Sequence, residues 1–171
     1  MMKRKNVVLV GFMGTGKSSV GHLLAKRLAW PFLDIDHLIE LQEGISIPDL
    51  FGSKGEDYFR RVESQVIHKV MEQDKQVIAT GGGAVLAEDN RNKMLKNGYV
   101  IALSARKETI IARVKLDHNR PLLQGNVDER VGILLEHRKH AYDFADLKID
   151  TTELTKDTIV EMIINGMEAL D

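Results

Sequence analysis

The chain has 171 residues, of which 43% are hydrophobic, a length and composition that suit one compact domain spanning residues 1–171. Its 24 Lys and Arg balance 25 Asp and Glu, and the net charge of −1 lacks the basic field that binding to nucleic acid or to an anionic membrane requires, so a small-molecule partner is favoured. The absence of cysteine excludes disulfides, thiolate zinc sites and cysteine nucleophiles.

The first residues, MMKRKN followed by VVLV, have the order of charge and hydrophobicity of a signal peptide. Their apolar part is shorter than the roughly 7 residues that such a peptide needs, and glycines follow at once. Further along, no segment approaches the run of about 18 apolar residues that is typical of a membrane span. We therefore expect a cytoplasmic protein.

Five short apolar runs, rich in Val and Ile, predict strands, and segments of helical period lie between them. This alternation is typical of an α/β fold in which helices flank a parallel sheet. Glycines at 44, 98 and 166 predict helix ends, and the polar stretch at residues 115–126 predicts a loop. The predicted strands are residues 7–10, 32–35, 77–79, 99–103 and 147–149. Three apolar helix faces are marked by Val20, Leu23, Leu24 and Leu28, by Phe59, Val62, Val66 and Val70, and by Ile159, Met162 and Ile163.

The segment GFMGTGKS, residues 11–18, stands between the first predicted strand and the first predicted helix. Gly11, Gly16, Lys17 and Ser18 satisfy the pattern GxxxxGK followed by Ser or Thr. The glycines allow the backbone to wrap around phosphate oxygens, and the N–H groups from Gly14 to Ser18 converge at a helix N-terminus. Lys17 is expected to reach the β- and γ-phosphates, and the Ser18 hydroxyl to ligate Mg²⁺. The segment predicts a site for a nucleoside triphosphate.

A P-loop also occurs in GTPase switches and in mechanical ATPases. The DLFG segment at residues 49–52 matches the DxxG of a GTPase, but it follows Pro48 in a helical context. The guanine-selecting NKxD is missing, since NKML at residues 92–95 has Leu where Asp is needed. An ATPase that acts on nucleic acid would need a basic stripe. These observations favour a small-molecule kinase.

The second predicted strand ends in FLDID, which places Asp34 and Asp36 on one face at the carboxyl end of the sheet, where ligands collect. The third strand ends in Thr80 and glycines, where many P-loop enzymes carry a metal-associated Asp. We therefore expect Asp34 to support the metal together with Ser18, and Asp36 to serve the substrate. Two alternatives remain open: Asp150 supplies the metal's carboxylate, or Asp36 is a helix N-cap and Asp34 is merely exposed.

The segments GFMGTGKS, LDID, FRRVE, TGGG and RPLL, in this order, resemble the shikimate kinases over residues 11–142. The resemblance implies a P-loop fold of the nucleoside-monophosphate-kinase type, with strand order 2-3-1-4-5 and a mobile lid at about residues 115–126. It also implies transfer of the γ-phosphoryl group of ATP to the 3-hydroxyl of shikimate, a step of aromatic amino acid biosynthesis, by a monomer with Mg²⁺ as cofactor. A gluconate or nucleotide kinase of similar fold is the alternative.

The resemblance also assigns roles to individual residues. Asp36, Lys17 and Arg120 are the catalytic residues, with Arg120 on the lid. The substrate is assigned to Asp36, Arg60, Gly81, Gly82 and Arg138. The nucleotide is assigned to Gly14, Thr15, Gly16, Lys17, Ser18, Ser19, Arg113 and Arg120.

Chemistry makes these assignments sensible. A planar guanidinium grips a carboxylate through two parallel hydrogen bonds, which a lysine cannot do. We favour Arg60 over Arg61 because Arg60 shares a helical stripe with Glu56 and Glu63. Around Arg138 the segment RKHAY lacks the proline that the family carries two positions after this arginine.

Two of the assigned segments also have simpler explanations. The glycine triplet lets a small substrate lie directly on backbone N–H groups, and its alternative is a flexible turn. Residues 115–126 are expected to close over the phosphates and exclude water, and the alternative is a plain surface loop.

Overall fold

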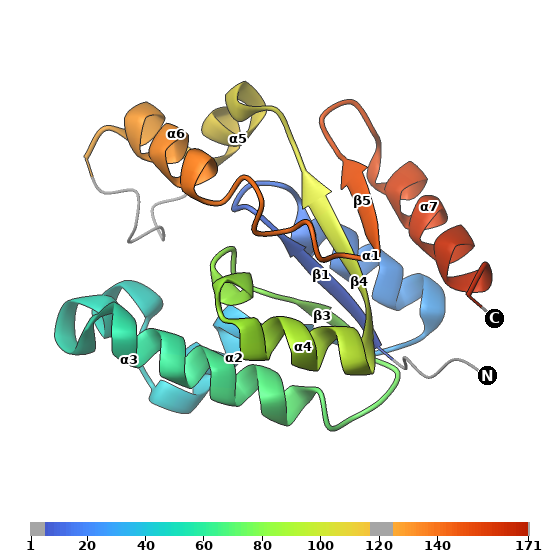
Figure 1. The fold of residues 1–171 in the computed structure, drawn as a ribbon, viewed down its shortest axis with the longest axis horizontal. Helices are drawn as coiled ribbons and strands as arrows, with labels where there is room; N and C mark the ends of the chain where they lie inside the picture. Colours follow the sequence, from blue (N-terminus) through green and yellow to red (C-terminus); the bar gives the residue numbers. More distant parts are fainter. Residues whose placement is uncertain (1–5, 117–124, 171) are drawn as a thin grey trace.

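The computed structural model describes residues 6–116 and 125–170. In this part of the chain five parallel strands form one sheet in the order β2-β3-β1-β4-β5 (Figure 1), the order that the resemblance implied. All five predicted strands match to within one residue at each end; the predicted second strand is one residue too long, because Ile35 begins a helix. The strands are β1 (Asn6–Gly11), β2 (Phe32–Asp34), β3 (Val77–Ala79), β4 (Gly98–Ser104) and β5 (Leu147–Asp150).

A helix follows every strand, and between strands the helices return the chain to the amino-terminal end of the sheet, as parallel strands require. They are α1 (Lys17–Leu28), α2 (Ile35–Glu43), α3 (Ile47–Val70), the 3₁₀ helix η1 (Ala84–Leu86), α4 (Glu88–Asn97), α5 (Lys107–Val114), α6 (Val127–His137) and α7 (Lys156–Glu168). The DLFG segment lies inside α3, in agreement with its helical interpretation.

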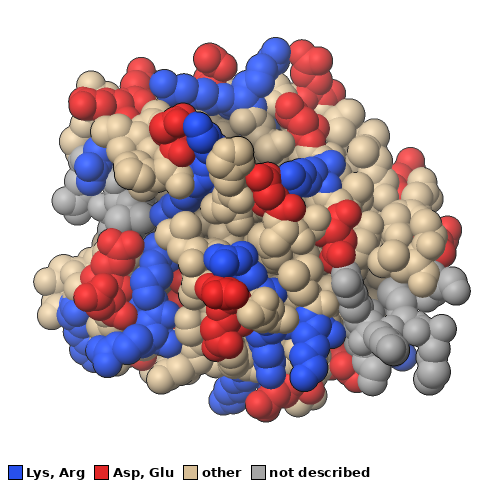
Figure 2. All heavy atoms as spheres, in the orientation of Figure 1, with Lys and Arg blue, Asp and Glu red and all other residues tan. Residues whose placement is uncertain are grey.

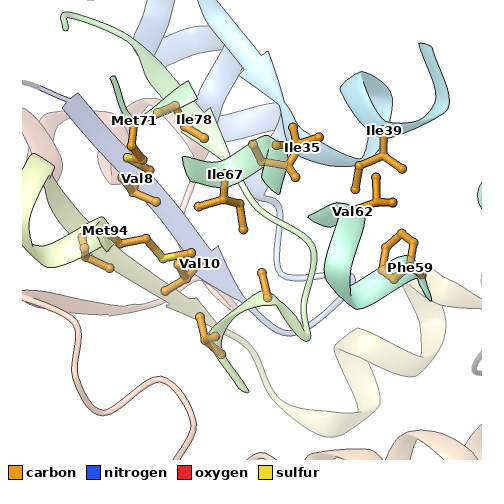
Figure 3. Packing of buried hydrophobic residues seen from close by; sticks show 14 of the residues in the cluster. Val8, Val10, Ile35, Ile39, Phe59, Val62, Ile67, Met71, Ile78 and Met94 are labelled. Atoms are coloured by element: carbon orange, nitrogen blue, oxygen red, sulfur yellow. The ribbon is translucent and has the colours of Figure 1, made fainter. Parts of the chain in front are cut away.

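The central strand β1 divides the core into two layers. Val7 and Leu9 pack against α1 and α7 on one face of the sheet, while Val8 and Val10 pack against α2, α3 and α4 on the other. Figure 3 shows the second layer, with Val8 and Val10 facing Ile67 and its neighbours. Complete burial of each such side chain contributes about 1.5–3 kcal/mol, so this alternation fixes the register of the strand.

A third and smaller apolar cluster anchors the loop after β1. Phe12 and Met13 pack against Ile110 and Val114 of α5 and against Val131 of α6. The phosphate loop is thereby held between the sheet and the α5–α6 pair, which lies beyond the carboxyl ends of the strands (Figure 1).

The predicted helix ends have different outcomes. Gly44 closes α2 with a left-handed φ of 72°, as expected. Gly98 follows α4 but is extended and begins β4. The prediction for Gly166 is wrong, because this residue lies within α7, where a Cβ atom would stand 2.5 Å from the Tyr99 hydroxyl. Met162 departs from its predicted apolar face and is half exposed.

Residues 117–124, which include Arg120 and the middle of the expected lid, lie outside the described residues. At the ends of this segment, Lys115 closes α5 and Asn126 caps α6 by accepting a hydrogen bond from the Glu129 N–H at 3.1 Å.

Charges of both signs alternate over the face shown in Figure 2, as the small net charge suggests. Over residues 6–116 and 125–170, every helix is too short or too polar to cross a membrane.

Candidate active site

The strand order brings three motifs together at the carboxyl-terminal end of the sheet. Because β2, β3 and β1 are neighbours, Asp34, Thr80 and the phosphate loop lie side by side at the carboxyl ends of their strands. A cavity of about 680 Å³ opens at this end. Its walls are formed by Gly14, Thr15, Gly16, Lys17, Ser18, Ser19, Val20, Asp34, Asp36, His37, Glu40, Ile47, Pro48, Thr80, Gly81, Gly82, Arg113, Thr151, Leu154, Lys156 and Ile159.

The phosphate loop has the backbone geometry that its glycines allow. Gly14 and Gly16 have left-handed φ values of 75° and 96°, which residues with a side chain rarely adopt. Lys17 Nζ lies over the loop and donates to the carbonyl oxygens of Gly11 at 2.6 Å and Phe12 at 2.9 Å. The N-terminus of α1 has no side-chain cap, and its first residues line the cavity, an arrangement that suits an anion.

Within this loop the Thr15 side chain has a structural role. It is fully buried, and its hydroxyl donates to the Phe12 carbonyl at 2.7 Å. The hydroxyl of Thr151, which follows β5, donates a hydrogen bond to the Thr15 carbonyl at 3.1 Å. Only backbone groups of Thr15 therefore remain for a ligand, while Ser18 and Ser19 are exposed at the cavity.

Asp34 has two hydrogen-bonding roles at the start of α2. One carboxylate oxygen accepts from the N–H groups of Asp36 at 3.0 Å and His37 at 3.4 Å, which caps the helix. The other accepts from the Ser18 hydroxyl at 3.1 Å. The expectation that Asp34 and Asp36 share a strand face is therefore wrong: the strand ends at Asp34, and Asp36 lies in the first helical turn. The alternative that Asp36 is the cap is wrong as well.

The Ser18 and Asp34 oxygens fit a magnesium ion. Among the described residues no group of three or more His, Asp or Glu side chains is placed to hold a metal. One carboxylate and one hydroxyl suit Mg²⁺, which takes few protein ligands and completes its octahedron with phosphate and water. The competing Asp150 lies on the edge strand β5, where it accepts from the Thr152 N–H at 2.9 Å and hydroxyl at 2.6 Å.

The first glycine of the triplet separates two carboxylates. A Cβ atom on Gly81 would stand 2.9 Å from Asp36 Oδ1 and 3.0 Å from Glu63 Oε2. Glu63, from α3, is only 1% exposed. Glycine is needed at position 81 because both carboxylates occupy the space that a side chain would fill.

The next two glycines lie against the two arginines. A Cβ atom on Gly82 would stand 3.3 Å from Arg138 Nη1, and one on Gly83 would overlap the guanidinium of Arg60. The triplet thus makes room for charged side chains of the protein itself, a role that residue types alone did not reveal.

Of the two adjacent arginines on α3, Arg60 is the one at the triplet. Its guanidinium donates to Glu63 at 2.8 Å and to Glu56 at 3.4 Å, the stripe that the helical spacing predicted. Arg61 instead lies over the ring of Tyr58, 5.6 Å from its centroid.

Arg138, at the end of α6, is buried to 4% exposure with its guanidinium 5.8 Å from the centre of the Phe12 ring. The chain then turns, with backbone hydrogen bonds donated by Lys139 and Ala141 on either side of His140, where the family carries proline. Arg138 thus reaches the triplet although residue 140 is histidine where the family carries proline.

Two carboxylates and two guanidinium groups thus gather around the glycine triplet: those of Asp36, Glu63, Arg60 and Arg138. Burial raises the pKa of Glu63 above its ordinary value of 4.5; Arg60 and Arg138 oppose the rise, and the nearby charge of Asp36 adds to it. Glu63 was expected only to hold Arg60, and its burial against Gly81 is visible in the tertiary structure alone.

Beside the phosphate loop the structure places Arg113, which the resemblance assigned to the nucleotide, together with residues that no motif marked. Arg113 donates to the Gly14 carbonyl at 2.8 Å and so lies beside the phosphate loop. Thr151, Leu154 and Lys156, from the segment after β5, complete the wall. No motif in the sequence marked these three residues as part of a site.

The family model described as shikimate kinase matches residues 13–168 of this chain. The chain is 45% identical to the shikimate kinase of Thermodesulfovibrio yellowstonii over 167 residues, which cover 97% of this chain and 96% of that protein. The chain belongs to the shikimate kinase family. Its activity is accordingly that of a shikimate kinase, which uses ATP in the shikimate pathway of aromatic amino acid biosynthesis.

Solved structures of shikimate kinases have the same fold. The enzyme from Acinetobacter baumannii in complex with shikimate superposes with a TM-score of 0.93 at 36% identity, covering 97% of this chain and 94% of that one. A gluconokinase from Sinorhizobium meliloti superposes with a TM-score of 0.63 at 17% identity, which is a likeness of fold alone. The predicted fold and family are confirmed.

Proposed function

We propose that the cavity holds the two substrates end to end, with ATP on the phosphate loop and shikimate at the glycine triplet. The observation that carries the proposal is the convergence of Asp36, Glu63, Arg60 and Arg138 on the triplet, next to the P-loop. An acidic sugar-like acceptor needs both a cationic grip and a base, and this group supplies both.

In this proposal the two guanidinium groups hold the carboxylate of shikimate. Arg60 is oriented by Glu63 and Glu56, and Arg138 by its burial against Gly82. Two fixed guanidinium groups define the orientation of the ring, so that its 3-hydroxyl faces the P-loop. Gly81 and Gly82 line the cavity at this end.

Asp36 orients this hydroxyl and takes its proton as the phosphoryl group is transferred. Its carboxylate lies against Gly81 and lines the cavity together with Lys17 and Ser18. The backbone N–H groups of the loop, the Lys17 amine and Arg113 surround the triphosphate, and Arg120 is proposed to approach it from the lid. This arrangement positions the acceptor for in-line attack on the γ-phosphorus.

Ser18 and Asp34 are proposed to hold Mg²⁺. Bound there, the ion would neutralise phosphate charge as the β–γ bond breaks. The 3.1 Å contact between the Ser18 hydroxyl and Asp34 already brings the two oxygens together.

Replacement of Asp36 by Asn tests the acceptor half of the site. Asn keeps the shape of the side chain but cannot take a proton, so we expect kcat to fall by about 10²- to 10⁴-fold. ADP release is measured with shikimate present and absent, and the KM for ATP serves as the control because the P-loop is untouched. A folded Asp36→Asn enzyme with normal kcat would contradict the role of Asp36.

A further inference from the structure

Tyr142 is a half-buried side chain at the acceptor end that the mechanism above does not use. It follows Arg138 by four residues, and its hydroxyl donates to the carbonyl oxygen of Gly82 at 2.7 Å, although the two residues are 60 positions apart. Its ring packs against two apolar clusters, one between the sheet and α2–α4 and the other around Phe12. The Tyr142 hydroxyl thus links the turn after α6 directly to the glycine triplet through a hydrogen bond.

The bond closes a small ring of contacts that contains Arg138. Gly82 receives the Tyr142 hydroxyl on its carbonyl, and the same residue lies against Arg138 Nη1. Between the two side chains the backbone forms a turn, in which the Ala141 N–H donates to the Arg138 carbonyl at 2.9 Å. A shift of the triplet relative to this turn would therefore change the position of Arg138.

The surroundings keep this hydroxyl protonated. Burial raises the pKa of Tyr142 to about 12, although the nearby charges of Arg138 and Arg60 oppose the rise. At neutral pH the phenol is a constant donor, and Gly82 offers the acceptor that a buried hydroxyl needs.

We propose that Tyr142 is a positioning residue for the acceptor substrate, and that its bond to Gly82 holds the glycine triplet and Arg138 in the relative position that receives shikimate. The inference rests on the proposed function, because it takes Arg138 as a contact of the shikimate carboxylate.

The first test is Tyr142→Phe, which removes one oxygen and keeps the ring in its apolar surroundings. The Gly82 carbonyl loses its hydrogen bond from Tyr142, and the triplet loses this link to the turn after α6. We expect the KM for shikimate to rise by about 5- to 30-fold, with the KM for ATP and kcat within about 2-fold of their original values. Both constants come from steady-state ADP release, with one substrate varied and the other saturating.

Tyr99→Phe is the matched control. Tyr99 is the more deeply buried tyrosine, at 5% exposure, and it lies on β4 and packs with α1 and α7 on the other face of the sheet. We expect this variant to leave both KM values unchanged. Thermal unfolding of the two variants separates a general loss of stability from a change at the site.

A double-mutant cycle with Arg138→Lys shows whether Tyr142 acts through Arg138. Lys keeps the charge but not the two parallel donors, so the KM for shikimate should rise in the single variant, and Tyr142→Phe should then add less than about 2-fold. If Arg138→Lys leaves shikimate affinity unchanged, the proposed role of Arg138 fails. If Arg138→Lys weakens shikimate but Tyr142→Phe does not, only the inference on Tyr142 fails.

Three other outcomes overturn the inference: effects of the two substitutions that multiply in the double variant, equal losses of shikimate and ATP affinity, and a lower Tm of Tyr142→Phe with unchanged KM values. In the last case the hydroxyl serves the stability of the fold alone.

Discussion

At the residue scale, Asp34 shows how one side chain can join local structure and chemistry. Its carboxylate caps α2 through one oxygen and contacts the Ser18 hydroxyl through the other. The cap needs only an oxygen acceptor, whereas a cation requires the negative charge. The two roles can therefore be separated by a substitution that removes the charge and keeps the acceptor.

Asp34→Asn is such a substitution, because Asn and Asp cap helices about equally well. We expect the free energy of unfolding to change by less than about 0.5 kcal/mol, and the Mg²⁺ concentration for half-maximal activity to rise on the order of 10-fold or more. Asp34→Ala is the control that loses both roles, with a further cost of about 1 kcal/mol in stability. An unchanged Mg²⁺ dependence in Asp34→Asn would exclude Asp34 from the metal site.

Glu63 is a second residue whose surroundings matter more than its type. Its raised pKa means that burial disfavours the carboxylate more than Arg60 and Arg138 favour it. The folded chain then binds a proton more tightly than the unfolded chain, so this group lowers the free energy of unfolding as the pH rises through 4.5 toward the folded pKa. The charge that orients Arg60 thus costs stability at neutral pH.

Glu63→Gln removes this cost, so its Tm should equal that of the original chain near pH 4.5 and exceed it increasingly as the pH rises. Each unit of pKa shift corresponds to about 1.4 kcal/mol. Thermal unfolding of both proteins between pH 4.5 and pH 7 measures this difference in Tm. Glu56→Gln, which removes a half-exposed partner of Arg60, is the control and should change stability by less than about 1 kcal/mol at any pH. A Tm of Glu63→Gln below that of the original chain at pH 7 would contradict the sign of the effect.

At the scale of elements, the glycine triplet is a fixed platform between two helical segments. On one side, Asn90 of α4 donates to the Ala84 carbonyl at 2.9 Å and Arg91 donates to the Val85 carbonyl at 2.7 Å. On the other, Tyr142 donates to Gly82. Hydrogen bonds therefore hold Gly82 and the 3₁₀ helix that follows the triplet, and the glycines are needed for the close approach of side chains.

Gly83→Ala tests this explanation. The new methyl group would overlap the guanidinium of Arg60, the movable end of a long side chain, so the chain should fold while Arg60 is displaced. We expect the KM for shikimate to rise by about 10-fold or more, as for the loss of charge-assisted hydrogen bonds, with the KM for ATP unchanged.

Gly52→Ala, in α3, is the matched control for this substitution. Nothing lies within 4 Å of the added Cβ, and alanine in a helix should stabilise the chain by about 0.5–1 kcal/mol without any effect on activity. Normal shikimate kinetics in Gly83→Ala would show that Arg60 does not depend on the glycine.

At the scale of the whole molecule, the strand order determines which motifs meet. Placing β3 between β2 and β1 sets the triplet between Asp34 and the P-loop, and leaves β5 with Asp150 at the far edge. The gluconokinase from Sinorhizobium meliloti has a related fold at 17% identity. The fold thus provides the cavity, and we expect side chains such as Arg60 and Arg138 to distinguish the acceptor.

Much of this arrangement follows from local patterns. Short apolar runs predicted the strands, GFMGTGKS predicted the phosphate loop, and helical spacing placed Arg60 with Glu56 and Glu63. Such predictions succeed because they depend on period, spacing and backbone freedom, which a few neighbouring residues determine.

The rest depended on contacts between distant segments. The end of β2 at Asp34, the place of Gly166 against Tyr99 and the charged groups against each glycine of the triplet could not be read from residue types. Each is a matter of which atoms occupy a given space, and residues far apart in the chain decide it. The sequence by itself therefore determined the chemistry available to this protein, a triphosphate loop with carboxylates and arginines, whereas only the tertiary structure decided that Tyr142, Gly82 and Arg138 meet.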